Sequence, residues 1–407
     1  MENSIHLVST GVMNSCEVRP SSSKSESNRT LIINALSGNP GGIENLSDAR
    51  DTQTMKRLLS STENTLDVLD AGTTMRFLTA YLAITTRQKV VLTGSARMQE
   101  RPIKILVEAL NALGADISYM KNDGFPPMEI RPFPGQKSNT FKIPSNISSQ
   151  YISALLMIAP VLPKGLIIEL VGEIYSEPYI RMTLALMERF GVHHHWEGQT
   201  IKIAPQEYKG GEYTIESDWS GASYWYSFVS LAKQGTIKIL SLREQSNQGD
   251  QAIASIMKNL GVESEYTTDG VILTKIDNQN SVEIDFRNCP DLAQTVMVSA
   301  AAQKINLTMT GLESLKIKET DRIVALQSEL AKTNVSMTED GATWHLNSEG
   351  FELKPNTQFE TYDDHRMAMA FAPLCMIAPI LVENPKVVEK SYPGFWDDLK
   401  RVGVAID

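Results

Sequence analysis

The chain has 407 residues, of which 42% are hydrophobic and 21% are charged, a composition typical of an ordinary soluble globular protein. Its length exceeds what a single hydrophobic core usually supports, so we expect two domains. The net charge of −10 argues against a nucleic-acid partner, because a polyanion requires a broad basic face.

The ends of the chain and its cysteines argue against three further classes of protein. Residues Met1 to His6 have neither the basic region nor the apolar run of a signal peptide. The longest mostly apolar stretch, Met367 to Val382, is short for a membrane span and contains two prolines. The three cysteines include no C-x-x-C pair, so they indicate neither a disulfide framework nor a zinc site. We therefore expect a cytoplasmic protein with no membrane contact, metal or other cofactor.

The first distinctive stretch is the octapeptide SSKSESNR, which begins at Ser22 and leads directly into an apolar segment. Ser25 is a suitable N-cap for a helix. Lys24 and Arg29 then lie near the positive end of the helix dipole, where a cation is unfavourable unless an anion lies close by. The stretch predicts a phosphate or carboxylate site. The alternative is a capped surface helix with Glu26 as a local counter-ion.

Similar segments recur along the rest of the chain. A small or polar cluster opens an apolar helix at several places, with a spacing of roughly 70 residues from the second place onward. These clusters are Ala71–Thr74, Ser148–Gln150, Trp219–Ala222, Pro290–Ala293 and Asp363–Arg366. A second helix in each repeat ends near Gly114, Gly191, Gly261, Asn334 and Gly403, each followed by an alternating strand. Each repeat reads as strand, helix, strand, helix and further strand, and about six repeats divide naturally into two domains of three.

The domain boundary is predicted near Glu216 to Ser220, because the repeat that contains Ser220 begins after the polar stretch Gln206 to Glu212. The alternating residues Ser15 to Arg19 predict a strand that belongs to the second domain and makes it discontinuous. We therefore predict an N-terminal domain of residues 19–218 and a C-terminal domain of residues 1–18 plus 219–407.

Two further stretches place cations where a segment begins. The segment LTGSARMQERP ends a strand and begins a helix, and Pro102 suits the first helical position. In the segment KIKETDR, a spacing of three and four residues places Lys318, Glu319 and Arg322 on one face if the segment is helical. A surface ion pair between Glu319 and Arg322 is the alternative.

The last such stretch is DDHRMAMAF. Asp363 or Asp364 is a candidate N-cap, and Arg366 directly precedes a helix that is apolar nearly all round and is therefore expected to be buried. Each cation taken singly has a surface explanation. Cations at several repeat starts in an acidic protein nevertheless favour anion binding. By contrast, His193–His195 lacks metal-ligand spacing and predicts no metal site.

Together these motifs resemble the EPSP synthase family along nearly the whole chain. The matching pieces, in the family's order, are SKSESNR, DAGTTMR, LTGSARMQERP, SSQ, YSEPYI, ESDWSGASYW, QGD, PDLAQT, KETDR, DDHRMAMAF and EKSYPGF. SKSESNR, RMQERP, KETDR and DHRMAM are together highly specific. The resemblance implies an α/β fold, similar to an inside-out α/β barrel. It has two domains of three βαβαββ repeats each, which two crossover strands join, and an active site in the interdomain cleft.

The resemblance also implies a reaction and its substrates. The family transfers the enolpyruvyl group of phosphoenolpyruvate to the 5-hydroxyl of shikimate 3-phosphate and releases phosphate through a tetrahedral addition intermediate. Both substrates carry a phosphate and a carboxylate, so the site must neutralise several negative charges at once. A monomer that requires no cofactor is implied. The family's inhibitor, glyphosate, is expected to compete with phosphoenolpyruvate.

The site residues carry over by their position in the matching motifs. Those implied for shikimate 3-phosphate are Lys24, Ser25, Arg29, Ser148, Ser149, Gln150, Ser176, Tyr179, Asp291 and Lys318. Those implied for phosphoenolpyruvate are Lys24, Gly72, Arg101, Gln150, Arg322, Arg366 and Lys390. The acid–base candidates are Asp291, Glu319 and Lys24. We favour Asp291 as the base that takes the hydroxyl proton and Glu319 as the acid that protonates the methylene carbon.

Three positions depart from the family's usual pattern. Ser21 and Ser22 replace Pro-Gly, Asp70 replaces Asn, and Ser314 replaces an Asn that often contacts shikimate 3-phosphate. Asp70 places a negative charge near the expected phosphoenolpyruvate site. None of these changes removes a charged residue expected to act in catalysis.

Two alternative functions stay open on the sequence. A sister transferase that acts on UDP-N-acetylglucosamine resembles this fold, but it carries a reactive cysteine in a Gly-rich loop, a setting that none of the cysteines here has. A non-catalytic relative that only binds anions is the other alternative. Asp291 and Glu319 argue against it, because binding two anions does not require additional carboxylates.

Overall fold

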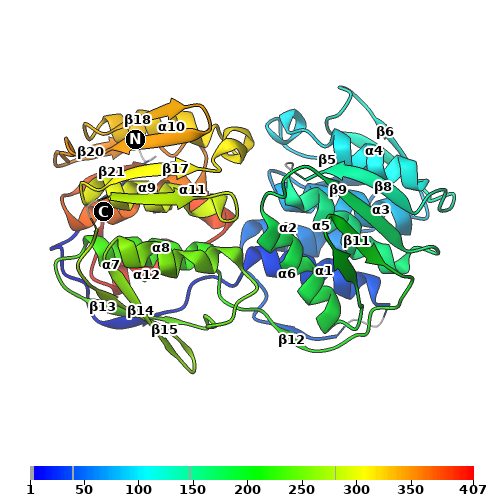
Figure 1. Cartoon of the computed structure of the whole chain (residues 1–407), viewed down its shortest axis with the longest axis horizontal. Coiled ribbons are helices and arrows are strands. Elements are labelled where there is room, and N and C mark those ends of the chain that lie inside the picture. Colours follow the sequence, from blue (N-terminus) through cyan, green and yellow to red (C-terminus); the bar gives the residue numbers. More distant parts are fainter. Residues whose placement is uncertain (1–3, 39–40, 146–147, 280) are drawn as a thin grey trace. The chain divides into compact units, whose positions relative to one another are not determined.

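The computed structural model describes residues 4–38, 41–145, 148–279 and 281–407, and it divides the chain into two compact units (Figure 1). Unit 2 is the continuous segment Ser23–Ile215, whereas unit 1 combines the residues up to Ser22 with Glu216–Asp407. The chain passes between the units twice, after Ser22 and after Ile215. Each unit has its own hydrophobic core of buried residues.

Unit 2 alternates helices and short strands. Its elements are α1 (Lys24–Leu36), β3 (Ile43–Glu44), α2 (Arg50–Leu59), β4 (Thr65–Asp67), α3 (Gly72–Thr85), β5 (Val90–Thr93), η1 (Met98–Glu100), α4 (Lys104–Leu113), β6 (Asp116–Tyr119), β7 (Met128–Arg131), β8 (Thr140–Pro144), α5 (Ser149–Ile158), η2 (Ala159–Val161), β9 (Leu166–Val171), α6 (Glu177–Arg189), β10 (His195–Glu197), β11 (Thr200–Ile203) and β12 (Tyr213–Thr214), where η marks a 3-10 helix.

Unit 1 has the same alternation. Its elements are β1 (Ser4–Val8), β2 (Cys16–Val18), α7 (Trp219–Leu231), β13 (Thr236–Leu240), η3 (Gly249–Ala252), α8 (Ile253–Asn259), β14 (Val262–Thr267), β15 (Gly270–Lys275), β16 (Ser281–Asp285), η4 (Pro290–Leu292), α9 (Ala293–Ala302), β17 (Asn306–Thr310), η5 (Glu313–Ile317), α10 (Arg322–Ala331), β18 (Ser336–Asp340), β19 (Thr343–Asn347), β20 (Thr357–Phe359), α11 (His365–Phe371), η6 (Ala372–Met376), β21 (Ile380–Glu383), η7 (Pro385–Lys390), α12 (Phe395–Arg401) and β22 (Ala405–Ile406).

The strands repeat one pairing pattern. Within the described residues they form five four-stranded sheets and one two-stranded sheet. In the order β4-β5-β7-β6 the first pair is parallel and the other two pairs are antiparallel, and β8-β9-β11-β10, β16-β17-β19-β18, β2-β13-β15-β14 and β20-β21-β1-β22 follow the same scheme. The first repeat has only the parallel pair β3 and β12. The predicted βαβαββ repeat is therefore confirmed in this part of the chain, with a reduced first copy.

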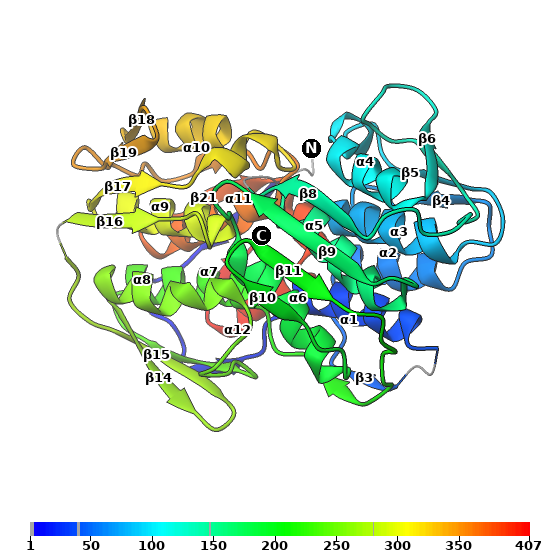
Figure 2. The same ribbon diagram turned by 45° about the vertical axis from the view of Figure 1, so that its right-hand side comes forward.

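The first helix of each repeat is the buried one. In unit 1, α7, α9 and α11 contact one another, and nearly every residue of each is buried. Figures 1 and 2 show these helices inside the unit, with the sheets that contain β14–β15 and β17–β18 on its outside. In unit 2, α1, α3 and α5 contact one another in the same way. The buried run after Arg366 confirms the prediction from its apolar sequence.

The second helix of a repeat ends at a residue with left-handed backbone. Gly114, Gly191, Gly261, Asn334 and Gly403 have φ values of 118°, 82°, 88°, 59° and 99°. Gly and Asn adopt this conformation at least cost, which lets the chain reverse into the next strand. This confirms the five predicted helix ends.

The N-terminal segment completes two sheets of unit 1. A strand was predicted from the alternation of Ser15 to Arg19, and strand β2 lies there. It pairs in parallel with β13, with Glu17 opposite Lys238. Strand β1 lies between β21 and β22 and pairs antiparallel with both. The last repeat is thus assembled from both ends of the chain.

Candidate functional site

In unit 1, the N-termini of the three buried helices carry polar side chains that contact one another. Ser220 lies in the first turn of α7, Asp291 lies in the 3-10 turn directly before α9, and Arg366 lies in the first turn of α11. Arg366 Nη2 donates to Asp291 Oδ2 at 2.9 Å and to Ser220 Oγ at 3.4 Å. Because the N-terminal end of a helix carries a partial positive charge, this end of the unit suits an anion.

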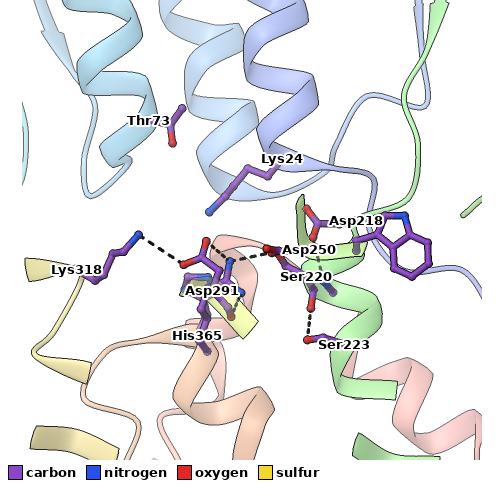
Figure 3. A network of polar contacts seen from close by, with 12 residues as sticks. Lys24, Thr73, Asp218, Ser220, Ser223, Asp250, Asp291, Lys318 and His365 are labelled. Atoms are coloured by element: carbon purple, nitrogen blue, oxygen red, sulfur yellow. Dashed lines mark hydrogen bonds and ion pairs between the residues drawn. The ribbon is translucent and has the colours of Figure 1, made fainter. Parts of the chain in front are cut away.

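Asp291 lies among three cations. Its Oδ1 lies 3.6 Å from Lys318 Nζ (Figure 3). The same Oδ1 accepts from Arg322 Nη1 at 3.1 Å, while Oδ2 accepts from Arg366. Burial raises the pKa of Asp291, but the positive charges, that of Arg366 first, outweigh burial and hold the pKa well below its usual range. Asp291 is therefore ionised at neutral pH.

Arg322 is buried and binds three carboxylates. Its Nε donates to Asp364 Oδ2 at 2.7 Å and its Nη2 donates to Asp364 Oδ1 at 3.3 Å. Its Nη2 also donates to Glu319 Oε2 at 3.0 Å, and its Nη1 binds Asp291. Burial lowers the pKa of Arg322, but the carboxylates, Asp364 first, outweigh burial and raise it above its usual value. Arg322 stays charged despite its 2% exposure.

Asp364 also serves the backbone. It is the N-cap of α11, and its Oδ1 accepts from the Arg366 N–H at 2.9 Å. The predicted cap is thus confirmed for Asp364, and the same carboxylate joins the start of α11 to the start of α10 through Arg322.

The segment before α10 is not the helix that its spacing suggested. The 3-10 turn η5 ends before Lys318, which has extended backbone, and Asp321 is the N-cap of a helix that begins at Arg322. The sequence placed these side chains on one face only if the segment is helical, and that condition is not met. Lys318 and Glu319 still lie close to Arg322, because Lys318 reaches Asp291 and Glu319 binds Arg322 directly; the other Glu319 oxygen lies 3.9 Å from buried Lys390.

Asp250 and Ser220 extend this group, and no role was predicted for either. Asp250 lies in η3, and the Ser220 hydroxyl donates to its Oδ2. Burial, and after it the charge of Asp291, raises the pKa of Asp250 to about 6. The QGD match contained Asp250, and its place directly before a helix was the available signal. We call the following residues the unit 1 charge cluster: Asp250, Asp291, Lys318, Glu319, Arg322, Asp364, Arg366 and Lys390.

In unit 2, Lys24 is the first residue of α1. Its Nζ lies 3.2 Å from Asp51 Oδ2 at the start of α2, a partner 27 residues away that the sequence gave no reason to select. The predicted N-cap is wrong by two positions. Ser23, rather than Ser25, caps α1 and accepts from the Glu26 N–H at 3.3 Å. Lys24 therefore begins the helix rather than preceding it.

Arg29 points into the core of unit 2. Its Nε donates to Thr183 Oγ1 at 2.7 Å, its Nη2 to Ser153 Oγ at 3.1 Å and its Nη1 to the Ser25 carbonyl at 2.9 Å. The guanidinium also lies 5.3 Å from the ring centre of Phe77. Burial lowers the pKa of Arg29 to about 10, which leaves it charged at neutral pH. In this structure Arg29 ties α1 to α5 and α6, and its substrate contact stays a prediction.

Gly72 begins α3 and lies directly against Arg101. A Cβ built on Gly72 would lie 2.7 Å from Arg101 Nη1, closer than a side chain tolerates. The glycine therefore allows the guanidinium to approach the helix start, where backbone N–H groups are also free to bind an anion. Pro102 does not occupy the first helical position as predicted, because α4 begins at Lys104 after extended backbone at Arg101.

The start of α5 supplies neutral donors. Ser148 is exposed and is the N-cap, and Ser149 and Gln150 form the first turn. Gln150 Nε2 donates to Thr73 Oγ1 at 3.0 Å, so the starts of α5 and α3 lie together. Thr73 was missed, although it follows Gly72 in the quoted DAGTTMR motif. A hydroxyl and an amide at one pair of helix starts suit an anion without adding charge.

The start of α6 lies beside α1. Ser176 has φ 56°, in the left-handed region, and directly precedes the helix, whose first turn contains Tyr179. The Tyr179 carbonyl accepts from Arg29 Nη2 at 3.4 Å. Ser176 and Tyr179 thus lie near Arg29. The contacts of their side chains with substrate stay predictions.

Two departures from the family pattern have local partners. Asp70 binds Arg50 at 2.8 Å in an ion pair with both side chains substantially exposed. Ser21 and Ser22 lie at the chain crossing, where the Ser21 carbonyl accepts from the Asp218 N–H at 3.0 Å and Ser22 forms a β-bridge with Ser217. The two serines therefore pair with unit 1 residues directly before the chain enters unit 2.

The histidine run has carboxylate neighbours on the surface of unit 2. His194 Nδ1 lies 3.2 Å from Glu188, and His195 Nε2 lies 3.4 Å from Glu197. In the part of the chain that the structure describes, no group of three or more His, Cys, Asp or Glu residues could hold a metal ion. Among the same residues, no helix is long and apolar enough to cross a membrane.

Comparisons with known proteins agree with the motifs. The sequence model of EPSP synthase (3-phosphoshikimate 1-carboxyvinyltransferase) matches residues 56–399. A 3-phosphoshikimate 1-carboxyvinyltransferase of Bacteroides fragilis is 48% identical over 392 residues, which cover 94% of each chain. Proteins of the same name from Haemophilus influenzae and Salmonella typhimurium are each 33% identical, over 412 and 410 residues, covering 93% of this chain and 94% of the relative.

Solved structures support the fold. An EPSP synthase from Acinetobacter baumannii matches with a TM-score of 0.79 over 100% of both chains, at 18% sequence identity. A second structure of an EPSP synthase from the same organism matches with a TM-score of 0.76 over 99% of both chains. At this identity the likeness concerns the fold, and it confirms the predicted α/β class.

Proposed function

The chain belongs to the EPSP synthase family, and we propose that it transfers the enolpyruvyl group of phosphoenolpyruvate to the 5-hydroxyl of shikimate 3-phosphate, releasing phosphate. The relatives named 3-phosphoshikimate 1-carboxyvinyltransferase support this reaction. The observation that carries the proposal is the position of Asp291, an ionised carboxylate held among Arg366, Lys318 and Arg322. Such a group can take a proton where anionic substrates bind.

The proposed phosphoenolpyruvate site draws on both units. From unit 1 it uses Arg322, Arg366 and Lys390, and from unit 2 it uses Lys24, Gly72, Arg101 and Gln150. Arginine guanidinium groups suit phosphate and carboxylate because they can donate two parallel hydrogen bonds. The Arg101 guanidinium supports this assignment, because it lies directly against the helix start at Gly72.

The proposed shikimate 3-phosphate site also draws on both units. Unit 2 supplies Lys24, Ser25, Arg29, Ser148, Ser149, Gln150, Ser176 and Tyr179, and unit 1 supplies Asp291 and Lys318. The helix starts of α1, α5 and α6 carry most of these groups. For Arg29 the proposal requires a change, because its donors bind protein groups in this structure.

We propose Asp291 as the base and Glu319 as the acid, with Lys24 as a third acid–base candidate. Asp291 would take the proton of the 5-hydroxyl while the hydroxyl oxygen bonds to the enolpyruvyl carbon. Glu319 would deliver a proton to the methylene carbon, which becomes a methyl group in the tetrahedral intermediate. Loss of phosphate and return of one methyl proton to Glu319 would then restore the carbon–carbon double bond. A strongly lowered pKa makes ligand-free Asp291 a weak base. Substrate anions that share Arg366 and Lys318 would raise that pKa and strengthen the base.

The arrangement of the active protein is part of the same proposal. We propose that units 2 and 1 are the N- and C-terminal domains and that the substrates bind between them. Since one chain supplies every proposed residue, a monomer suffices. Both substrates are small metabolites, and we place the reaction in the cytoplasm.

The test is phosphate release by the purified protein. With phosphoenolpyruvate present, shikimate 3-phosphate should support phosphate release and UDP-N-acetylglucosamine should not. Release with UDP-N-acetylglucosamine instead would assign the chain to the sister reaction. If neither acceptor supports phosphate release, but calorimetry shows that phosphoenolpyruvate and shikimate 3-phosphate bind, the chain is a binding protein.

A further inference from the structure

Asp250 is a buried carboxylate that the proposed mechanism does not use. It is 3% exposed and accepts a hydrogen bond from the Ser220 hydroxyl (Figure 3). The same Ser220 Oγ accepts from Arg366 Nη2 at 3.4 Å, and that Nη2 also donates to Asp291 Oδ2 at 2.9 Å. A continuous chain of hydrogen bonds therefore joins Asp250 to Asp291.

The direction of this chain is set at its buried end. A serine hydroxyl has one hydrogen to donate and lone pairs that accept. While Asp250 is ionised it can only accept, so the Ser220 hydrogen points to Asp250 and an Oγ lone pair faces Arg366. Arg366 can only donate, so it requires this orientation. A protonated Asp250 could donate to Ser220 instead and release the hydroxyl hydrogen toward Arg366.

We propose that Asp250 is a positioning residue that acts through Ser220 to hold the Arg366 guanidinium on Asp291. This inference rests on the proposed function, because Arg366 is assigned there to phosphoenolpyruvate and Asp291 to the hydroxyl proton. Asp250 is assigned no contact with substrate in the proposed mechanism. Its effect is to keep Arg366 Nη2 in one place, from which the guanidinium meets both the carboxylate and the incoming anion.

The surroundings of Asp250 make this device sensitive to pH. The charged groups that face it are Asp291, Arg366 and Asp218, and it also faces the Cys289 thiol, whose pKa burial raises to about 12. Burial and then the charge of Asp291 raise the pKa of Asp250 to about 6, whereas Arg366 and the Ser220 hydrogen bond oppose the rise. Asp250 is then ionised above about pH 6 and protonated below it. The kcat/KM for phosphoenolpyruvate should fall as the pH decreases through this value.

The experiment compares three variants with the wild type across pH 5 to 8, with saturating shikimate 3-phosphate. Asp250→Asn and Ser220→Ala should each lower kcat/KM for phosphoenolpyruvate by about tenfold to hundredfold, as expected for losing a hydrogen bond to a charged group. Most of the change should lie in KM, and the ionisation near pH 6 should disappear. The double variant should lose little more than either single variant, because both substitutions break the same chain.

Glu216→Gln is the matched control. Glu216 is another buried carboxylate of unit 1, and it accepts from Trp219 Nε1, the Arg243 N–H, Ser246 Oγ and Gln248 Nε2. Neutralising it should lower the melting temperature and leave both the KM for phosphoenolpyruvate and the pH profile as in the wild type. A general effect of buried charge would instead change the profile in this variant too.

Three outcomes would overturn the inference. The first is an unchanged pH profile and KM in Asp250→Asn, and the second is additive losses in the double variant. The third applies if Asp250→Asn does not fold, so that Ser220→Ala alone tests the inference. In that case, retention of the ionisation near pH 6 by Ser220→Ala would overturn it. Wild-type protein that releases no phosphate would instead overturn the proposed function, and this inference with it.

Discussion

The two units place different chemistry on the same scaffold. In both, three buried helices pack together and present their N-termini at polar clusters. In unit 1 those starts carry carboxylates interleaved with cations, such as Asp291 with Arg366 and Asp364 with Arg322. In unit 2 they carry a lysine, a glycine with a guanidinium against it, serines and an amide.

We propose that the repeated helix starts provide the anion-binding positions and that the side chains on them decide which unit exchanges protons. Helix starts bind anions whatever their sequence. Only groups that exchange protons near neutral pH can act as acid and base. We therefore expect substitution of the proposed acid and base in unit 1, Glu319 and Asp291, to reduce turnover, and substitution of Gly72 in unit 2 to reduce binding.

The largest effect is expected from Glu319→Gln. Glutamine keeps the size and the hydrogen bond to Arg322 but cannot cycle a proton, so turnover should fall by about 10²–10⁴ while the KM for phosphoenolpyruvate changes far less. Glu313→Gln, an exposed glutamate of the same segment, should behave as the wild type. Near-normal turnover in Glu319→Gln would show that unit 1 does not supply the acid through this residue, and would contradict the proposed difference between the units.

The next effect concerns stability rather than turnover. Asp364→Ala removes both a bidentate partner of buried Arg322 and the N-cap of α11. Breaking a buried ion pair commonly costs about 3–5 kcal/mol, so chemical denaturation should show a loss in this range. Asp321→Ala, which removes only the N-cap of α10, should cost about 1 kcal/mol. An equal loss of unfolding free energy in the two variants would mean that the Arg322–Asp364 ion pair contributes no stability beyond that of the N-cap.

In unit 2, Gly72→Ala should affect binding. The added methyl group would meet the Arg101 guanidinium, which must then move, and overpacking a tight site commonly costs about 1–3 kcal/mol. We expect glyphosate inhibition to weaken by at least roughly tenfold, with a higher KM for phosphoenolpyruvate and retained turnover. An unchanged inhibition constant would withdraw Gly72, and the turn that contains it, from the phosphoenolpyruvate site.

The smallest effect is expected from Asp70→Asn. The Asp70–Arg50 pair is 44% exposed at the arginine and 37% exposed at the aspartate, and exposed pairs contribute about 0–1 kcal/mol. Stability should therefore change by less than about 1 kcal/mol. The KM for phosphoenolpyruvate should stay within about threefold, because Arg50 already compensates the charge of Asp70. A larger decrease in KM would show that the Asp70 carboxylate repels phosphoenolpyruvate. Unit 2 would then also contain a carboxylate that affects substrate binding.

Local signals predicted most of the fold. Helix ends at Gly191 and Asn334 and the cap at Asp364 were predicted, because capping and left-handed backbone depend on a few adjacent residues. Where two nearby residues could cap a helix equally well, the prediction was wrong. Ser23 rather than Ser25 caps α1, since both have the same side chain and only the tertiary position of the helix distinguishes them.

The polar partners in the site could not be predicted in the same way. The Lys24–Asp51 pair spans 27 residues and the Arg366–Asp291 pair spans 75, so only the packing of separate repeats brings them together. Family motifs supplied the identity of the proposed reactive residues but not their partners. Asp250 shows the limit most clearly, because its environment is created by Ser220, Asp291 and Arg366 from three other segments.

The position of β1 has a consequence for how the chain folds as it is synthesised. Unit 2 is continuous and can fold once Ile215 has been made, but the partners of Ser4–Val8 are β21 and β22, at the other end of the chain. The first strand must therefore wait through nearly the whole of translation before it can pair. Closing so long a loop slows assembly, and a waiting strand with unpaired edges is prone to associate with other chains. Late-forming contacts in unit 1 should accordingly depend on chaperones more than those of unit 2.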